Sequence, residues 1–238
     1  MRGVLLAGGS GSRLLPLTRA VNKHLLPVGG QPMILHGLRK LTGAGIADVL
    51  VVTGPEAVGA FAALLGSGEE YGCRVHFRVQ QRPGGIAEAL SLAEGFAAGE
   101  PILALLGDNL FEGELAGFRT RFESQGGGAR VLLAEADDPE RLGVAELKDG
   151  RVVSIEEKPA QPRSNLAVIG VYAYDGAVFD HIRGLSRSAR GELEITDVNR
   201  TYLARGELQH ELLQGWWEDA GTHASLAAAN RRFPVPET

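Results

Sequence analysis

The chain has 238 residues, a formal net charge of −5, 44% hydrophobic residues and 22% charged residues. This size and composition indicate one large globular domain, or two closely merged halves, with a sizeable core. The acidic balance argues against a nucleic-acid partner, no apolar run could span a membrane, and the N-terminus does not resemble a signal peptide. The only cysteine, Cys73, cannot form an internal disulfide, which fits a reducing cytoplasmic location.

Strand and helix patterns alternate through the first half of the chain. Near-continuous apolar strands that alternate with helices indicate a parallel sheet covered on both faces. Ligands of such sheets bind at the carboxyl ends of the strands, so we expect the loops that follow these strands to meet at one edge. The expected strands are 4–7, 48–53, 74–80 and 101–106, and the expected helices are 31–44, 56–65 and 85–98.

The second half has a more mixed pattern. Alternating residues on both sides of the sequence Lys148-Asp149-Gly150 predict a β-hairpin. We therefore predict a single α/β domain over residues 1–233, with halves 1–110 and 111–233 and a short tail at 234–238. The expected strands of the second half are 129–135, 144–147, 151–156, 167–174 and 208–213, and the expected helices are 194–205 and 223–232.

The first predicted strand runs into a glycine-rich loop with the sequence GGSGSR at residues 8–13. Glycines leave backbone N–H groups unshielded, so such a loop can surround a phosphate, and Arg13 adds a forked cation. The loop lacks the lysine of a P-loop and the glycine spacing of a dinucleotide-binding fingerprint, which argues against a nicotinamide dehydrogenase. A plain tight turn is the alternative interpretation.

Lysine is rare in this chain and occurs only at positions 23, 40, 148 and 158. Lys23 follows the glycine loop closely, and Lys158 stands beside Glu157 at the end of the predicted hairpin. Each could bind a phosphate as a compact cation. The alternatives are a solvated surface lysine at 23 and a weak surface ion pair at 157–158.

Gln80 ends a predicted strand and is followed by a glycine-containing loop with Gly85. A glutamine amide can pair with both a donor and an acceptor on the edge of a base, and Gly85 would let a flat ring lie on the backbone. A polar loop that starts a helix is an equally good interpretation of this stretch.

Two aspartates are candidates for binding a metal ion. Asp108 follows a buried apolar strand, and Asp219 lies in the stretch WWEDAGT near the C-terminus. Two carboxylates together with phosphate oxygens and water make an ordinary Mg²⁺ site. Asp219 could instead cap the last helix, although Thr222 suits that position better. The histidines are scattered and lack zinc-ligand spacing.

Eight stretches, in order from Met1 to about Asn230, resemble the motifs of the sugar-1-phosphate nucleotidyltransferases, most closely those members that form dTDP-glucose. The resemblance implies a Rossmann-like, mostly parallel sheet flanked by helices, with a nucleotide-binding half at 1–110 and a merged, mixed-sheet sugar-binding half at 111–233. The stretches are LLAGGSGSRLLPLT, NKHLLPVGGQPMI, LGDN, PERLGVAEL, IEEKP, SNLAVIGVYAYD, SARGELEITDVNRTYL and WWEDAGTH.

The resemblance also implies roles for individual residues. Arg13, Lys23, Lys158 and Asp108 would be catalytic, and Mg²⁺ would bind Asp108 and Asp219. Gln80 and Gly85 would contact thymine. The triphosphate would lie on Gly8, Gly9, Ser10, Gly11, Ser12 and Arg13, with Lys23 and Asp108 beside it. Glucose 1-phosphate would bind Asn109, Gly143, Glu157, Lys158, Val168, Tyr172 and Arg190. The chain departs from the family pattern at Ser12, His24 and Gly84, where Thr, Gln and Asp are usual.

The implied reaction is Mg²⁺-dependent transfer of a thymidylyl group from dTTP to α-D-glucose 1-phosphate, giving dTDP-glucose and pyrophosphate. Two alternatives remain open: transfer from UTP or another nucleoside triphosphate, and a non-catalytic regulatory protein that binds sugar nucleotides. Neither a nucleic acid nor a membrane is expected as a partner. Longer members of the family carry C-terminal helices linked to dimer contacts and to an inhibitory nucleotide site, whereas this chain stops soon after the last motif. The absence of these helices argues against that regulation and against the usual tetramer, although the resemblance still allows a homo-oligomer.

Overall fold

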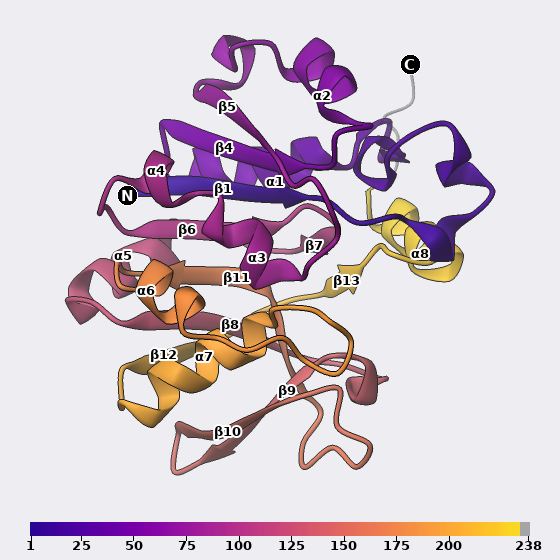
Figure 1. Cartoon of the computed structure of the whole chain (residues 1–238). Helices are drawn as coiled ribbons and strands as arrows, with labels where there is room; N and C mark the ends of the chain where they lie inside the picture. The colour runs from indigo at the N-terminus through magenta and orange to yellow at the C-terminus, as the bar shows by residue number, and fades with distance from the viewer. Residues whose placement is uncertain (234–238) are drawn as a thin grey trace.

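The computed structural model describes residues 1–233, so the predicted tail at 234–238 lies outside the described residues. Within this range a nine-stranded sheet runs through both halves of the chain (Figure 1). Its main path has the order β10-β9-β11-β6-β1-β4-β5, and β8 and β12 join it beside β11. The strands are β1 (Arg2–Ala7), β4 (Asp48–Thr53), β5 (Arg74–Val79), β6 (Ile102–Leu106), β8 (Ala129–Glu135), β9 (Gly143–Lys148), β10 (Arg151–Glu157), β11 (Leu166–Tyr174) and β12 (Leu208–Leu212).

The prediction of a mostly parallel sheet is confirmed. Strands β4 and β6 pair with β1 in parallel, and β5 pairs with β4 in parallel. Strand β11 is antiparallel to β6 and to β8, and β12 is parallel to β8. The predicted hairpin is β9 and β10, which pair antiparallel. The continuous apolar run of β1 is explained by its position at the centre, where helices cover both faces of the sheet.

Helices cover the sheet in two layers, each with its own apolar core. Residues of α3, α4, α6 and α7 pack on one face, in front of the sheet in Figure 1, and residues of α1, α2 and α5 pack on the other. A third, smaller cluster lies under α8. The helices are α1 (Ile34–Gly43), α2 (Val58–Leu65), α3 (Ile86–Ser91), α4 (Glu94–Ala97), α5 (Ala116–Gln125), α6 (Val178–Arg183), α7 (Ile195–Ala204) and α8 (His223–Arg232).

Several predicted boundaries differ from the structure. The helix expected at 31–44 begins at Ile34, because the preceding residues form a two-strand ladder of β2 (Pro27–Val28) and β3 (Gln31–Pro32). The helix expected at 85–98 is divided into α3 and α4. Helices α5 and α6 were not expected; α5 is largely polar and buries only Phe118 and Phe122 among its ten residues.

The small ladder of β7 (Asn109–Phe111) and β13 (Trp217–Asp219) was also not expected, and it is the element that shapes the site. The two strands pair antiparallel, and Asp219 stands opposite Asn109. The backbone N–H of Ala220 donates to the carbonyl oxygen of Asp108 at 2.9 Å. In this way a ladder of three residue pairs joins two strands that are separated by residues 112–216 of the chain.

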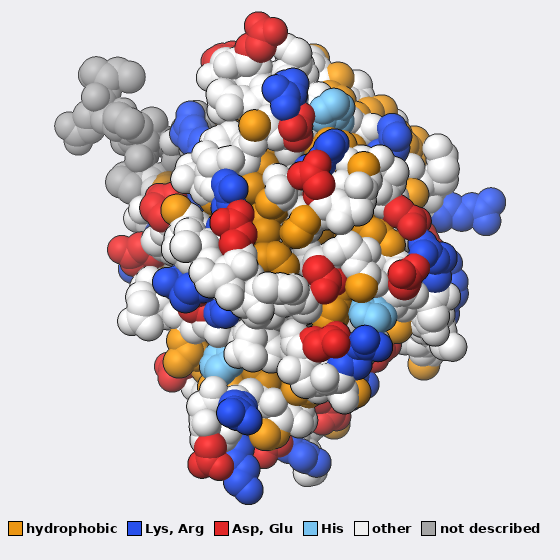
Figure 2. Space-filling model, turned by 90° about the vertical axis from the view of Figure 1, so that its left-hand side faces the viewer, with side chains coloured by type: hydrophobic (Ala, Val, Ile, Leu, Met, Phe, Trp, Pro, Cys, Tyr) orange, Lys and Arg blue, Asp and Glu red, His pale blue; other side chains and the backbone are white. Residues whose placement is uncertain are grey.

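At the end of the sheet opposite the carboxyl ends of the parallel strands, charged side chains of both signs are mixed, as in the ion pairs Arg2–Glu100 and Arg74–Asp48. Figure 2 shows this face, on which the visible Lys and Arg side chains are interspersed with Asp and Glu. Among the described residues, no helix is long and apolar enough to cross a membrane. The remaining short elements are 3₁₀ turns at Ser12–Leu14, Leu17–Arg19, Lys23–Leu25, Glu69–Tyr71 and Pro139–Arg141.

Candidate active site

Two cavities open at the carboxyl edge of the sheet. The larger has a volume of about 920 Å³ and lies between the β7–β13 ladder and the β9–β10 hairpin. The smaller, of about 400 Å³, lies over the loop after β1. The larger cavity is lined by the predicted site residues Ser12, Arg13, Asp108, Asn109, Gly143, Glu157, Lys158, Val168, Tyr172, Arg190 and Asp219. The smaller is lined by the predicted residues Gly8, Gly9, Ser10 and Gln80.

A buried ion pair of Lys23 and Asp108 stands at the centre of this edge. The Lys23 ammonium donates a hydrogen bond to Oδ2 of Asp108, and the two side chains are only 14% and 11% exposed. Asn109 donates to Oδ1 of Asp108 at 3.2 Å. Burial by itself would raise the pKa of Asp108, but the charge and hydrogen bond of Lys23 outweigh it and hold that pKa well below its usual range.

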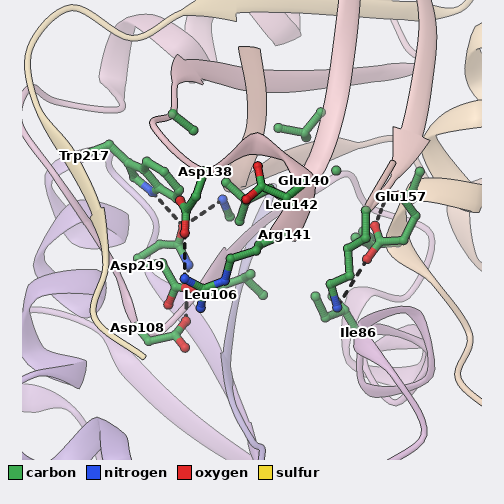
Figure 3. Close-up of a pocket in the computed structure, with 18 of the residues that line it drawn as sticks. Ile86, Leu106, Asp108, Asp138, Glu140, Arg141, Leu142, Glu157, Trp217 and Asp219 are labelled. Atoms are coloured by element: carbon green, nitrogen blue, oxygen red, sulfur yellow. Dashed lines mark hydrogen bonds and ion pairs between the residues drawn. The ribbon is translucent and has the colours of Figure 1, made fainter. Parts of the chain in front are cut away.

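Asp219 lies next to Asp108 at the wall of the larger cavity (Figure 3). Arg13 approaches its Oδ2 at 3.7 Å, and the backbone N–H of Gly221 donates to its Oδ1 at 3.1 Å. Burial and then the negative charge of Asp108 raise the pKa of Asp219. Thr222, as expected, caps α8 instead of Asp219, through a capping box with Ser225.

The two carboxylates fit a hard divalent cation. The negative charge of Asp108 disfavours the ionised form of Asp219, and a cation between the two carboxylates would offset that repulsion. Among residues 1–233 no cluster of three or more His, Cys, Asp or Glu side chains forms a complete metal site. Oxygen atoms of phosphate and water would therefore have to complete the coordination shell.

The glycine loop adopts the backbone conformations that its composition suggested. Gly9 and Gly11 have φ angles of +97° and +60°, which disfavour residues with a Cβ. The Thr18 hydroxyl donates to the carbonyl oxygen of Gly11 at 2.8 Å and holds the turn closed. A Cβ on Gly9 would lie 3.8 Å from Nζ of Lys23, so this ammonium lies directly beside the loop.

His24 is packed against Gly107, where a Cβ would lie 2.8 Å from Cδ2 of the ring, and is not a titrating group of the site. It is 1% exposed, and its Nδ1 lies 2.8 Å from Oδ1 of Asn22. Burial, followed by the charge of Lys23, lowers the pKa of His24 to about 3, so the ring is neutral at ordinary pH. The buried, neutral ring therefore has a structural role.

Gln80 and Gly85 come together at the second loop of this edge. The Gln80 amide donates to Oε1 of Glu88 at 3.2 Å and weakly to the carbonyl oxygen of Gly85 at 3.4 Å. Gly85 has a φ of +99°, and a Cβ there would lie 2.3 Å from the carbonyl oxygen of Leu193. One face of Gly85 is thus covered by the main chain of Leu193, and the contact of this loop with a base stays a prediction.

The far wall of the larger cavity is built around Glu157. Its Oε2 accepts a 2.6 Å hydrogen bond from the hydroxyl of Thr196. Arg190 donates to its Oε1 at 3.2 Å, and the Lys158 ammonium lies 3.7 Å from the same oxygen. Lys158 has a φ of +46°, unusual for a residue with a side chain, and its backbone N–H donates to Leu142. Glu157 lies across the cavity from the two aspartates in Figure 3.

Two residues have surroundings that the sequence did not indicate. Glu194 stands at the N-terminus of α7, but its carboxylate accepts hydrogen bonds from Ser188 and Arg190 and makes no capping bond. The side-chain oxygen Oδ1 of Asn109 accepts a hydrogen bond from the indole N–H of Trp217 at 2.7 Å and from the backbone N–H of Gly170 at 3.1 Å. Asn109 therefore holds the ladder and Asp108 in place, and its contact with a sugar phosphate stays a prediction.

Several residues of the cavity were missed. Thr196 orients Glu157, Trp217 donates to Asn109, and Arg141 reaches into the cavity near Asp219 while paired with Asp138 at 2.6 Å (Figure 3). Arg141 lies in the stretch PERLGVAEL, which was noticed only as a motif. The hydrogen bonds of Thr196 and Trp217 join side chains that are 39 and 108 residues apart, and such bonds leave no signal in spacing or periodicity.

Comparison with known proteins identifies the class of protein that this fold and site define. A family model described as nucleotidyl transferase matches residues 2–234, and the chain belongs to that family. Members of the family generally use a divalent metal ion. Glucose-1-phosphate thymidylyltransferases from Xanthomonas campestris and Actinoplanes sp. are 46% and 49% identical over 96% of this chain, which covers 79% and 77% of their lengths.

Solved structures agree in fold. A crystal structure from Bacillus anthracis, assigned as a glucose-1-phosphate thymidylyltransferase in complex with sucrose, is 48% identical and superposes with a TM-score of 0.95. The comparison covers 100% of this chain and 97% of that one. A UDP-glucose pyrophosphorylase complexed with UDP-glucose superposes with a TM-score of 0.87 at 23% identity over 98% of this chain and 97% of that one, which is evidence for the fold alone.

Proposed function

We propose that the chain transfers a thymidylyl group from dTTP to α-D-glucose 1-phosphate, with Mg²⁺ as cofactor, and releases dTDP-glucose and pyrophosphate. The observation that carries the proposal is the pair of adjacent carboxylates, Asp108 and Asp219, with Lys23 and Arg13 bound to them beside a glycine loop. The names of relatives at 42–49% identity support the same substrates. The cytoplasmic location stays a prediction from the cysteine content.

The reaction needs no covalent intermediate with the protein. An oxygen of the sugar phosphate attacks the α-phosphorus of dTTP in line, and the bond from that phosphorus to the bridging oxygen breaks. Pyrophosphate leaves with the electron pair of that bond. When bound at Asp108 and Asp219, Mg²⁺ would neutralise phosphate oxygens. Positioning and charge neutralisation are sufficient for this chemistry.

The cations of the chain divide between the two phosphates. Arg13 and Lys23 lie beside the glycine loop and would stabilise the leaving pyrophosphate. Lys158 and Arg190 lie on the opposite wall, around Glu157, and would hold the attacking phosphate. Glu157 and the Thr196 hydroxyl would bind sugar hydroxyls. The nucleotide would thus be bound at the wall with the glycine loop and the sugar phosphate at the opposite wall. The α-phosphorus would lie between these two walls.

The experiment that tests the proposal measures pyrophosphate release and identifies the product by mass. The purified chain is supplied with Mg²⁺, each of the four dNTPs or UTP, and the 1-phosphates of glucose, galactose or N-acetylglucosamine. We expect dTDP-glucose to be the main product. Discrimination between T and U rests on one methyl group, worth about 1–3 kcal/mol, so a lesser activity with UTP is compatible with the proposal. Nucleotide binding without pyrophosphate release in any combination would instead indicate a non-catalytic sensor.

Gly85→Ala should impair nucleotide binding. The added methyl group would collide with the carbonyl oxygen of Leu193 at a φ of +99°, at a cost of about 1–3 kcal/mol, so the Gln80–Gly85 loop would have to move. We expect KM for dTTP to rise about tenfold or more. Gly95→Ala is the control, because a Cβ there meets nothing within 4 Å. Equal kinetics of the two variants would show that the loop conformation is unimportant for the nucleotide.

Glu157→Gln should affect the sugar substrate selectively. The amide keeps the shape of the side chain but loses the charge that Arg190 and Lys158 contact. We expect KM for glucose 1-phosphate to rise about tenfold, the usual size for loss of a charged hydrogen bond, with KM for dTTP almost unchanged. Glu156→Gln removes a neighbouring but exposed charge and serves as the control. A parallel rise in both KM values would argue against a sugar contact.

A further inference from the structure

The segment of residues 187–193 lies across the loop that contains Gly85, and the two are joined by main-chain hydrogen bonds. The N–H of Leu193 donates to the carbonyl oxygen of Gly84 at 2.8 Å, and the N–H of Ala87 donates to the carbonyl oxygen of Leu193 at 3.1 Å. The absence of a side chain at Gly85 makes this approach feasible. The proposed base-binding loop is therefore in direct contact with a segment from the other half of the chain.

An ion pair ties the same two segments through their side chains. Arg187 donates to Oε2 of Glu88, and its other terminal nitrogen donates to the carbonyl oxygen of Gly191 at 2.7 Å. The other carboxylate oxygen of Glu88 accepts from the Gln80 amide at 3.2 Å. The hydrogen bond from Arg187 keeps the pKa of Glu88 below its usual range, so Glu88 is charged at neutral pH. Glu88 thus contacts Gln80, which is proposed to bind the base, on one side and Arg187 on the other.

The far end of the segment carries Arg190, the proposed ligand of the sugar phosphate. Its guanidinium lies within 3.5 Å of carboxylate oxygens of Glu157, Glu192 and Glu194. Its backbone N–H donates to the hydroxyl of Ser188 at 3.2 Å. The turn that presents Arg190 is closed by hydrogen bonds between Ser188 and both Gly191 and Glu192. Arg187 holds this turn through Gly191, the residue that follows Arg190.

We propose that Glu88 and Arg187 are positioning residues that couple the nucleotide site to the sugar-phosphate site. The inference rests on the proposed function and assigns a role to two residues that contact neither substrate in that proposal. A base bound at Gln80 fixes the amide that holds Glu88, Glu88 fixes Arg187, and Arg187 fixes the turn that carries Arg190. A sugar phosphate bound by Arg190 then has less chain to order, so each substrate strengthens the binding of the other.

The expected coupling is modest but measurable. Arg187 is 52% exposed and Glu88 25%, so water screens the ion pair, and most of the coupling must come from ordering the chain. Coupling between two sites usually changes affinity by fivefold or more. We expect glucose 1-phosphate to bind about fivefold more tightly, or better, when the nucleotide site is filled. Loss of the pair should reduce this factor below about twofold.

The test uses an inert nucleotide so that no reaction occurs. Calorimetry measures the affinity of the full chain for glucose 1-phosphate, with Mg²⁺, in the absence and presence of saturating α,β-methylene-dTTP. The variants are Glu88→Gln, Arg187→Gln and the double variant. The matched control is Arg183→Gln, which breaks an ion pair between Arg183, 57% exposed, and Glu94, away from both loops. Thermal unfolding of each variant confirms that it is folded.

The expected result is coupling in the unaltered chain and in Arg183→Gln, and its loss in Glu88→Gln and Arg187→Gln. The double variant should lose no more than either single variant, because the two residues act as one unit. A purely structural role would lower stability or both affinities and leave the coupling factor unchanged, which overturns the inference. Pyrophosphate release by the unaltered chain is measured in parallel. Turnover without coupling refutes only this inference, whereas absence of both turnover and nucleotide binding refutes the proposed function and the inference with it.

Discussion

Asp108→Asn is expected to reduce Mg²⁺-dependent pyrophosphate release by about 10³-fold or more. The substitution removes one of the two carboxylates proposed to bind the metal ion and leaves the Lys23 ammonium buried beside a neutral amide. Asparagine keeps the size of the side chain, so the variant should still fold, but loss of one charge of the buried ion pair should also lower its unfolding free energy by about 3–5 kcal/mol. The measurement is a titration of Mg²⁺ at saturating substrates.

Asp137→Asn is the matched control for this prediction. Asp137 lines the same cavity, but it has no part in the proposed metal pair. Its substitution should leave turnover within a few-fold of the unaltered chain. Circular dichroism of both variants separates a loss of catalysis from a loss of structure. Near-normal turnover by Asp108→Asn would refute the assignment of the metal site.

Lys23→Met is expected to lower turnover by about 10²-fold or more and also to destabilise the fold. The positive charge of Lys23 offsets the cost of burying the ionised Asp108 carboxylate, and both side chains are almost fully buried. Removing one partner of a buried ion pair typically costs about 3–5 kcal/mol of unfolding free energy. Lys23→Arg should recover part of the stability, because it restores a cation at the same place.

Urea unfolding and steady-state kinetics test this prediction together. Lys148→Met is the control, since Lys148 is exposed at the end of β9 and is another of the four lysines of the chain. We expect that variant to match the unaltered chain in both measurements. If Lys23→Met were as stable and active as Lys148→Met, the ion pair would have neither a structural nor a catalytic role.

The sequence alone predicted the central elements well, because their signals are local. The apolar run at β4 and the capped helix α8 are observed with the expected boundaries, and the end of β6 places Asp108 at the predicted edge. Helix α5 was missed because its exposed polar residues conceal a face of only two buried aromatic rings. Two buried positions are too few to show the periodicity of a helix in a single sequence.

The meeting of Asp108 with Asp219 could not be derived from local patterns and was implied only by the family resemblance. It depends on the β7–β13 ladder, three residues on each side, which lacks the length and alternation of a recognisable strand. The same holds for Arg190, whose guanidinium lies among three carboxylates from two distant segments. Contacts of this kind are set by the tertiary fold. The residue types therefore suggested candidates for the site, but which residues contact one another could be seen only in the structure.

The most direct test of the central claim is a crystal structure of the full chain with α,β-methylene-dTTP and Mn²⁺, which replaces Mg²⁺ and is located by its anomalous signal. We predict one ion that is bound by carboxylate oxygens of both Asp108 and Asp219, at about 2.1–2.2 Å, and by phosphate oxygens of the nucleotide. An ion bound elsewhere, or carboxylates too far apart to share one ion while the nucleotide is in place, would contradict the account.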